Sequence, residues 1–399
     1  MKRLQQTILG IAFCGLVSLA SAFAITDKPV GFASIGTGTT GGTGGTTVVV
    51  TTIADLKTYA SSTAAYIIYL QGTVGTNDAG TVDTAGGSMS VVTVKGNKTI
   101  FGLPGSKLLG RMLIKSVSNV IIRNMTIQGP GAVDVDGQDA MTIQASTNVW
   151  IDHCDISDGQ DGNLDMVNLS NNLTISWTKF HYTSLSRTTK GADGLLPHKY
   201  SSLICGTTAT SNTDFYQITM QYNWWADGVT ERMPRVRYGK VDVVNNLVTT
   251  TGNNYAVRAG LNASILVESN AFIGTKTPVD IFSSETGQAV TVKHNLFSGT
   301  SGMTAGTSTA SFARATYYTN LTILDSSKVQ AAVQGTNGTG ATLCDVRTST
   351  CLTGTSSSSV SSSSVVSTSS SASTAIRRII QSIHSSNSES GFDLLGRFR

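Results

Sequence analysis

The sequence predicts an all-β fold, a right-handed parallel β-helix, and three observations lead to this prediction. Only 13% of the 399 residues are charged, and the chain holds 41 Gly but only 6 Pro. The sequence shows no heptad and no long helical pattern, which argues against coiled coils and helix bundles. A short apolar pattern recurs through the middle of the chain, and its repeats carry Asn at one fixed place.

The repeats alternate apolar residues, then place Asn or a small residue, then an aromatic or aliphatic residue. They are Val120–Ile127, Val149–Ile156, Leu173–Phe180, Ile218–Trp225, Val241–Val248, Ile265–Phe272 and Val290–Phe297. The last four align Asn223, Asn246, Asn270 and Asn295, which are 23, 24 and 25 residues apart. A fixed period in this range indicates a solenoid or a propeller, and each repeat is too short for a propeller blade of about 40 residues. Turn asparagines of successive coils can stack and bind neighbouring backbone, which favours the β-helix over a β-sandwich.

The N-terminus has the features of a secretory signal peptide over residues 1–24. Lys2 and Arg3 precede an apolar run from Ile8 to Leu19, and Ala22-Phe-Ala24 matches the pattern that signal peptidase accepts. The run is short for a membrane span, which needs about 20 residues. We therefore expect an exported protein that has no membrane association once the signal is cleaved.

The rest of the chain divides into one large domain and a short end region. We expect the β-helix domain over residues 25–352 and a flexible Ser-rich linker over residues 353–374. Residues 375–399 are too few for a core of their own, so we expect a disordered tail or the remnant of a lost module. A β-helix needs covered ends, and we expect the segments before Val48 and after Leu321 to cover them in a monomer.

Charge and cysteine usage fit an extracellular protein. The net charge of +4 is diffuse, which argues against a nucleic-acid partner. Four cysteines remain after signal cleavage, and an even number in an oxidising compartment suggests two disulfides. Cys344–Cys351 would close a short loop, which leaves Cys154–Cys205 as the second pair. No cysteine or histidine spacing suggests zinc.

The few charges form two clusters. The acidic one spans residues 134–165, where Asp161 and Asp165 flank three residues and Asp139 lies roughly one coil earlier. Stacked coils would bring these three carboxylates together, and they would repel one another unless a hard cation such as Ca²⁺ lay between them. A solvated acidic loop is the alternative.

The basic cluster holds three arginines in six residues, from Arg232 to Arg237, around Pro234. Arginine offers paired donors to carboxylates, so a polyanionic ligand bridged by metal and arginine is one interpretation. Ordinary surface arginines paired with acidic residues are the other.

Four motifs together resemble those of extracellular pectate lyases, which are single-domain parallel β-helices. They are Val149-Trp-Ile-Asp-His-Cys154, Asp161 with Asp165, Leu173-Thr-Ile-Ser-Trp177, and Arg232-x-Pro234-x-x-Arg237. They occur in the family's order and approximate spacing, and the resemblance extends from Gly31 to about Phe297.

The resemblance implies roles for particular residues. Asp139, Asp161 and Asp165 match calcium ligands, while Gly137 stands where some relatives carry a further Asp. Arg232 matches the catalytic base and Arg237 the second arginine of the cleft. The substrate-binding lysine matches Lys199 with an offset of one residue, and Lys190 is the alternative. His153 is expected to form a hydrogen bond within its coil rather than to act in catalysis.

These roles imply a secreted, calcium-dependent lyase that acts on polygalacturonate of the plant cell wall. Arg232 would remove the C5 proton, and β-elimination would leave an unsaturated uronate end; because arginine has a pKa above about 12, an alkaline optimum is expected. The alternatives are a pectin lyase, which acts on methyl esters without calcium, a polygalacturonase, and a non-catalytic polysaccharide-binding β-helix. Asn212-Thr-Asp214 superficially fits a polygalacturonase motif, but that family's other motifs are missing.

Overall fold

A computed structural model of the chain describes residues 28–77, 89–133, 138–190, 196–206 and 212–348. The expected signal peptide (1–24), linker (353–374) and tail (375–399) lie outside these ranges, so those boundaries stay predictions. Within the described ranges, no helix is both long enough and apolar enough to cross a membrane.

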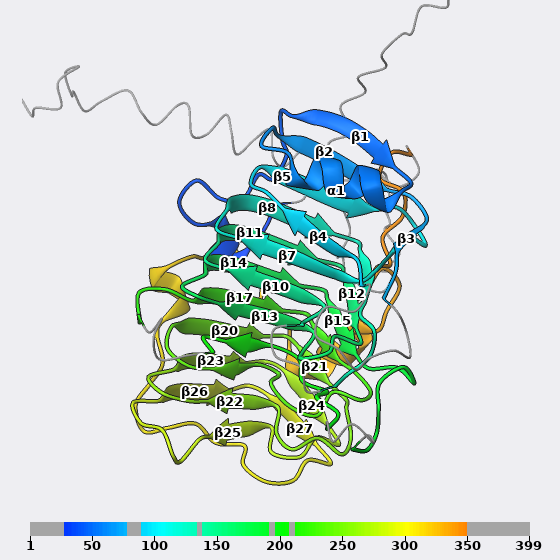
Figure 1. The fold of residues 1–399 in the computed structure, drawn as a ribbon. Coiled ribbons are helices and arrows are strands. Elements are labelled where there is room, and N and C mark those ends of the chain that lie inside the picture. Colours follow the sequence, from blue (N-terminus) through cyan, green and yellow to red (C-terminus); the bar gives the residue numbers. More distant parts are fainter. Residues whose placement is uncertain (1–27, 78–88, 134–137, 191–195, 207–211, 349–399) are drawn as a thin grey trace, which may run out of the picture. The chain divides into compact units, whose positions relative to one another are not determined.

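The described strands form three parallel sheets, and the chain visits the sheets in a fixed rotation. Each coil contributes one strand to an eight-stranded sheet, then one to a ten-stranded sheet, then one to a nine-stranded sheet. Eight such coils follow one another from β4 to β27 (Figure 1). The fold is a right-handed parallel β-helix, which confirms the prediction from the repeats.

The eight-stranded sheet consists of β4 (Val91–Val94), β7 (Arg111–Lys115), β10 (Met141–Gln144), β13 (Leu164–Val167), β16 (Leu203–Ile204), β19 (Arg235–Val236), β22 (Val257–Ala259) and β25 (Val279–Ile281). The ten-stranded sheet consists of β1 (Thr46–Val50), β2 (Tyr66–Leu70), β5 (Lys98–Gly102), β8 (Ser118–Arg123), β11 (Thr147–Asp152), β14 (Asn171–Ser176), β17 (Gln217–Gln221), β20 (Lys240–Val244), β23 (Ser264–Glu268) and β26 (Ala289–Lys293). The nine-stranded sheet consists of β3 (Thr73–Gly75), β6 (Lys107–Leu109), β9 (Thr126–Gln128), β12 (Asp155–Ser157), β15 (Lys179–His181), β18 (Trp224–Trp225), β21 (Leu247–Val248), β24 (Ala271–Ile273) and β27 (Leu296–Ser298). The helices of the described ranges are the 3₁₀ helices η1 (Gly31–Ser34) and η3 (Arg314–Thr316) and the α-helices α1 (Ile53–Ser61) and α2 (Ser326–Val333).

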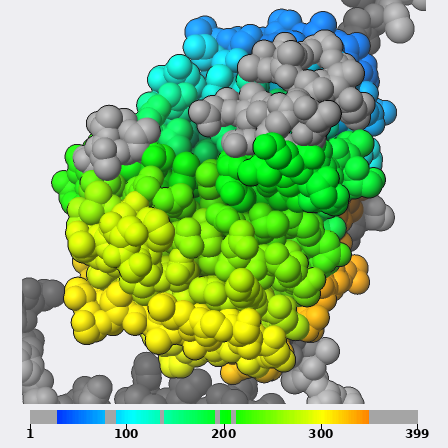
Figure 2. Space-filling view, turned by 60° about the horizontal axis from the view of Figure 1, so that its bottom comes forward, coloured from blue at the N-terminus to red at the C-terminus, as the bar shows by residue number. Residues whose placement is uncertain are grey.

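Each predicted repeat spans one strand of the ten-stranded sheet, a corner, and one strand of the nine-stranded sheet. The alternation places every second side chain inside the coil, and inward residues of successive coils lie in register. Ile122, Ile151, Ile175 and Met220 form one such wholly buried column. In Figure 2 the surface follows the sequence from the blue N-terminal coils to the green and yellow later ones, as expected where each coil contacts mainly its neighbours.

The four aligned asparagines form a ladder at the corner between the ten- and nine-stranded sheets. Asn246 Oδ1 accepts from the backbone N–H of Asn223 at 2.8 Å, and the backbone N–H of Asn246 donates to Asn270 Oδ1 at 2.8 Å. Asn295 accepts from the Asn270 amide in the same way. Each residue just before a ladder position has a positive φ, as at Tyr222 (52°), which turns the chain through the corner. The predicted stacking is thereby confirmed.

The prediction that the segments before Val48 and after Leu321 cover the two ends of the β-helix is wrong for the described residues. Helix α1 buries Leu56 and Ala60 against the core and packs on β2 and β4, so it covers the N-terminal end. The segment before Val48 lies instead against the ten-stranded sheet, where the Phe32 amide donates to Thr219 Oγ1 at 3.1 Å. The outward hydroxyls of that sheet satisfy the backbone of this segment, which sequence periodicity does not reveal.

The segment of residues 321–348 runs back along the asparagine-ladder corner rather than over the last coil. Its Leu324 amide donates to Asn245 Oδ1 at 2.9 Å, and its Leu343 amide donates to Asn124 Oδ1 at 2.8 Å. Between these points the Gly340 amide donates to the carbonyl of Trp177 at 2.9 Å. The segment therefore ties late coils to early ones along one edge of the helix.

The expected Cys154–Cys205 disulfide is wrong. Neither cysteine is in a disulfide, and both are buried. Cys154 lies inside the ladder corner, two coils before Cys205, which follows β16 in the eight-stranded sheet. The Cys154 thiol donates to the carbonyl of Asp152 at 3.4 Å, and burial raises its pKa to about 12. Cys351 lies outside the described residues, so the Cys344–Cys351 pairing stays a prediction.

Candidate active site

The predicted calcium ligands, the substrate lysine Lys199 and the two predicted arginines lie at the eight-stranded sheet. Asp139 precedes β10, Asp161 precedes β13, and Asp165 is within β13. Lys199 precedes β16, while Arg232 and Arg237 flank β19. The strands β10, β13, β16 and β19 are consecutive neighbours in this sheet, so four successive coils build the region.

The structure brings Asp139 and Asp165 together over Gly162. A Cβ atom at Gly162 would lie 3.0 Å from Asp139 Oδ1 and 3.6 Å from Asp165 Oδ1. Both carboxylates are buried, with exposed fractions of 2% and 6%. Any larger residue at position 162 would therefore fill the space that the two carboxylates face, and the sequence motif did not single out this glycine.

Burial and mutual repulsion disfavour the charged forms of these two carboxylates. Burial, followed by the charge of Asp161, raises the pKa of Asp139 to about 6, although Thr142, Arg111 and Arg232 act in the opposite direction. Burial and then the charge of Asp139 raise the pKa of Asp165 well above its ordinary value. Asp165 Oδ1 accepts from the Leu203 amide at 2.9 Å.

One carboxylate oxygen of this pair is unsatisfied. Asp139 Oδ2 accepts from Thr142 Oγ1 at 3.0 Å, but Asp139 Oδ1 is buried and has no hydrogen-bond partner. A buried unsatisfied group costs about 1–3 kcal/mol, and more when it is charged. A hard cation with oxygen ligands would satisfy it, so the donors present fit Ca²⁺.

The third predicted ligand, Asp161, points to a different partner. Its carboxylate lies 2.8 Å from Nδ1 of His198, the residue that precedes Lys199 in the chain. In the described part of the chain, no three His, Cys, Asp or Glu side chains are grouped closely enough to hold a metal ion. The structure thus assembles two of the three predicted carboxylates and leaves Asp161 bound to His198.

Arg232 lies beside the acidic pair in an uncommon backbone conformation. Its φ is +61°, a region that non-glycine residues seldom adopt and that costs of order 1–3 kcal/mol. Its guanidinium lies 4.5 Å from the centre of the Tyr200 ring, and its Nε is buried without a hydrogen-bond partner. Its charge lowers the pKa of both Asp139 and Asp165, which places it within electrostatic reach of the pair.

Tyr200 is a site residue that the sequence analysis missed. It follows Lys199 directly, and its ring contacts both Arg232 and His198, with a centroid distance of 3.8 Å to the imidazole. No motif in the sequence singles out this position, because the role of Tyr200 depends on the direction of its ring.

Lys199 and Arg237 extend the region on either side of Arg232. The Thr230 amide donates to the carbonyl of Lys199 at 2.8 Å, and burial lowers the pKa of the lysine. Arg237 donates through Nε to Glu285 Oε1 at 2.8 Å and through Nη1 to the carbonyl of Gly206 at 3.0 Å. The hydrogen bond to Glu285 raises the pKa of Arg237. The alternative lysine, Lys190, is exposed.

His153 forms a hydrogen bond within its own coil, as the sequence analysis expects. Its Nδ1 lies 2.7 Å from Asp152 Oδ2, and its ring stacks on Trp177 at the ladder corner. Arg123 Nε donates to the same carboxylate at 2.7 Å. This network lies at the ten-stranded sheet rather than at the sheet that carries the candidate site.

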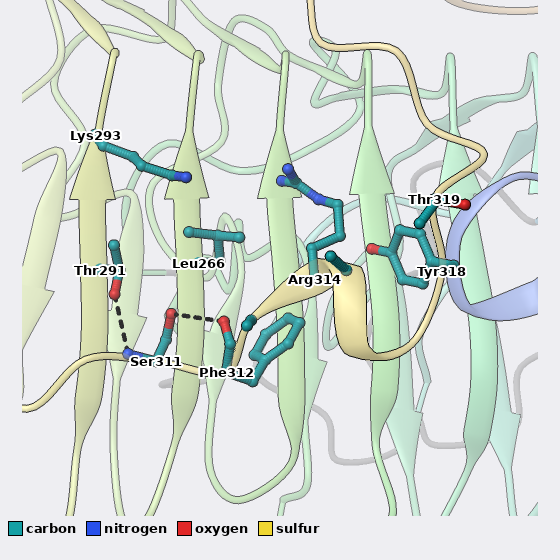
Figure 3. A pocket seen from close by; sticks show the side chains of 10 residues that line it. Leu266, Thr291, Lys293, Ser311, Phe312, Arg314, Tyr318 and Thr319 are labelled. Carbon is teal, nitrogen blue, oxygen red and sulfur yellow. Dashed lines mark hydrogen bonds between the residues drawn. The ribbon is translucent and has the colours of Figure 1, made fainter.

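A cavity of about 450 Å³ lies over the ten-stranded sheet, between β23, β26 and residues 311–319 (Figure 3). Its charged groups are already paired, since Arg314 Nη1 donates to Glu268 at 2.6 Å and Lys293 lies 2.9 Å from the same residue. The cavity therefore offers no unsatisfied polar group comparable with Asp139 Oδ1.

Comparison with known proteins agrees with this geometry. The family model described as pectate lyase matches residues 1–375. A probable pectate lyase B of Aspergillus terreus is 33% identical over 78% of this chain and 88% of its own length. Pectate lyase plyB of Emericella nidulans shows the same identity and the same coverage of both chains.

The fold has known counterparts as well. A solved structure of a pectate lyase bound to a hexasaccharide superposes with a TM-score of 0.62, covering 79% of this chain and 97% of that one at 22% identity. At that identity the likeness supports the fold, while the family model and the fungal relatives support the family. The chain belongs to the pectate lyase family of polysaccharide lyases.

Proposed function

We propose that the protein is a secreted, calcium-dependent pectate lyase that cleaves α-1,4-polygalacturonate by β-elimination. The products would be 4,5-unsaturated oligogalacturonates, and the substrate would be the pectate of plant cell walls. The observation that carries the proposal is the buried, unpartnered Asp139 Oδ1 beside Asp165, with Arg232 within electrostatic reach. The curated fungal relatives, which are named as pectate lyases, support the substrate class.

The residues that would hold calcium are Asp139 and Asp165, with Asp161 as a third carboxylate. Calcium bound there would neutralise the pair and, through the substrate carboxylate, make the C5 proton of the uronate more acidic. Asp139 and Asp165 have the oxygen donors that calcium prefers, and Gly162 leaves the space between them open.

The cationic residues would orient the polyanion. Arg237 is fixed by its ion pair with Glu285 and its bond to Gly206, and the Nη hydrogens that these contacts leave unused would donate to a uronate carboxylate. Lys199 lies on the neighbouring coil and would contact another part of the substrate. We expect a monomer to suffice, because all of these residues belong to one chain.

Arg232 is assigned as the base of the reaction. In its neutral form, a guanidine nitrogen would take the C5 proton, the C5–H electron pair would form the C4–C5 double bond, and the C4–O4 bond would break. The leaving O4 would then take a proton from solvent. The Tyr200 ring, whose centre lies 4.5 Å from the guanidine carbon, and the burial of Nε hold the Arg232 side chain in one place for this step.

The test replaces Arg232 by alanine and follows the ultraviolet absorbance of the unsaturated product with polygalacturonate and calcium. We expect activity to fall about 10²–10⁴-fold, the usual contribution of a positioned base. Arg347→Ala is the matched control, because Arg347 pairs with Asp345 near Tyr69, in the first coils of the helix. Retained lyase activity in Arg232→Ala with normal calcium dependence would refute the assignment.

A further inference from the structure

Arg111 lies near Asp139, although nothing in the sequence suggested a role for it. It begins β7, the strand that pairs directly with β10, which follows Asp139. Its Nη1 donates to Gln138 Oε1 at 2.8 Å and its Nη2 donates to Thr142 Oγ1 at 3.1 Å. Its Nε is buried and has no hydrogen-bond partner.

The contact with Thr142 fixes the direction of one proton. A threonine hydroxyl has a single O–H donor, and because its oxygen accepts from Arg111, the proton is free to point elsewhere. The hydroxyl donates to Asp139 Oδ2 at 3.0 Å. Arg111 therefore acts through Thr142 to hold Asp139 Oδ2, which leaves Oδ1 as the oxygen that faces Gly162.

The guanidinium also acts by its charge. Burial lowers the pKa of Arg111, while the charges of Asp139 and Asp161 raise it. Charges that are partly removed from water interact more strongly than exposed ones. A fixed cation at this place stabilises the carboxylates when no metal is bound, and it repels a divalent cation that enters the same site.

We propose that Arg111 is a positioning residue and internal counter-charge that lowers the calcium affinity of the site while stabilising its metal-free form. This inference rests on the proposed function, because it takes Asp139 and Asp165 as calcium ligands. It adds a residue of this chain that sets the calcium concentration at which the enzyme works.

The experiment measures calcium binding by calorimetry without substrate, together with the melting temperature in chelator. Arg111→Gln removes the charge, so we expect the dissociation constant for calcium to fall about tenfold or more and the melting temperature in chelator to fall. Arg111→Lys keeps the charge, and its dissociation constant should stay within about threefold of the wild-type value.

Lys115→Gln is the matched control. Lys115 lies on the same strand and the same face, four residues further on, or about 13 Å along the strand. At that distance an exposed charge is largely screened at ordinary salt. Its loss should change neither the calcium affinity nor the melting temperature in chelator.

The outcomes separate this inference from the proposed function. If the wild-type protein binds no calcium, the proposed function fails. If the wild type binds calcium but Arg111→Gln binds it equally or more weakly, the role of Arg111 is refuted and the proposed function is untouched. Should Arg111→Gln not fold, Arg111→Met, which keeps the apolar stem, gives the same comparison.

Discussion

The asparagine ladder allows a quantitative prediction, and Asn246→Ala is the most informative change. The Asn246 side chain is wholly buried. It accepts from the Asn223 backbone and side chain at 2.8 and 3.0 Å, and it donates to the Met220 carbonyl at 2.8 Å and to Asn270 Oδ1 at 3.0 Å. Alanine removes all four bonds and introduces no new partner.

The cost follows from the groups that lose their partners. The backbone N–H of Asn223 loses its acceptor, and because Asn223 is wholly buried, no solvent can take the place of the Asn246 side chain. The carbonyl of Met220, which is also buried, loses the hydrogen bond from the same side chain. Each buried group left unsatisfied costs about 1–3 kcal/mol, so the free energy of unfolding should fall by about 2–6 kcal/mol.

The assay is urea unfolding followed by circular dichroism, with Asn295→Ala as the matched control. Asn295 makes the same type of contacts at the end of the ladder, but it is only partly buried, so water can replace its side chain. We expect Asn295→Ala to lose less than half as much stability as Asn246→Ala. Equal losses in the two variants, or a loss below about 1 kcal/mol in Asn246→Ala, would refute the reasoning.

Two further predictions concern buried groups outside the site. Burial would raise the pKa of Asp152, but His153 and Arg123 outweigh it and hold the pKa at about 2. This pKa lies below that of an Asp in the unfolded chain, so ionised Asp152 contributes about 2–3 kcal/mol to the free energy of unfolding above pH 4, and this contribution is lost as the pH falls towards 2. The urea midpoint of Asp152→Asn should therefore depend less on pH over this range than that of the wild type. Equal dependence in the two proteins would contradict the pairing of Asp152 with His153 and Arg123. The Cys154 thiol is buried and its pKa is raised to about 12, so it should resist iodoacetamide at pH 8 until the protein is unfolded. A disulfide-linked Cys154–Cys205 peptide in a non-reducing digest would contradict the assignment of Cys154 as a thiol.

The coils could be predicted from the sequence because their inward positions are chemically constrained. A side chain inside a coil must be apolar or must satisfy its own polar groups, and so the alternating residues and the ladder asparagines recur at a fixed period. Cys154 occupies the same corner position as Asn223, two coils earlier in the ladder. The even number of cysteines suggested a disulfide at this position. The prediction was wrong because the number of cysteines carries no information on where each side chain lies in the coil.

The candidate site was predictable in its motif residues but not in the residues that orient them. Asp165 lies in β13 and Arg235 in β19, and only β16 separates these two strands in one parallel sheet, so motif order along the chain becomes proximity in space. The contacts of Asp161 with His198 and of Arg111 with Thr142 depend on side-chain direction across coils. No periodic pattern encodes those directions, and for this reason Arg111, Thr142 and Tyr200 emerge only from the structure.

The most direct test of the proposed chemistry is mass analysis of the products from polygalacturonate, with calcium and with a chelator. We predict oligogalacturonates that are one water lighter than the hydrolysis products, formed with calcium, absent in chelator and restored when calcium is added back. Saturated hydrolysis products, or cleavage that persists in chelator, would contradict a calcium-dependent β-elimination at the site of Asp139, Asp165 and Arg232.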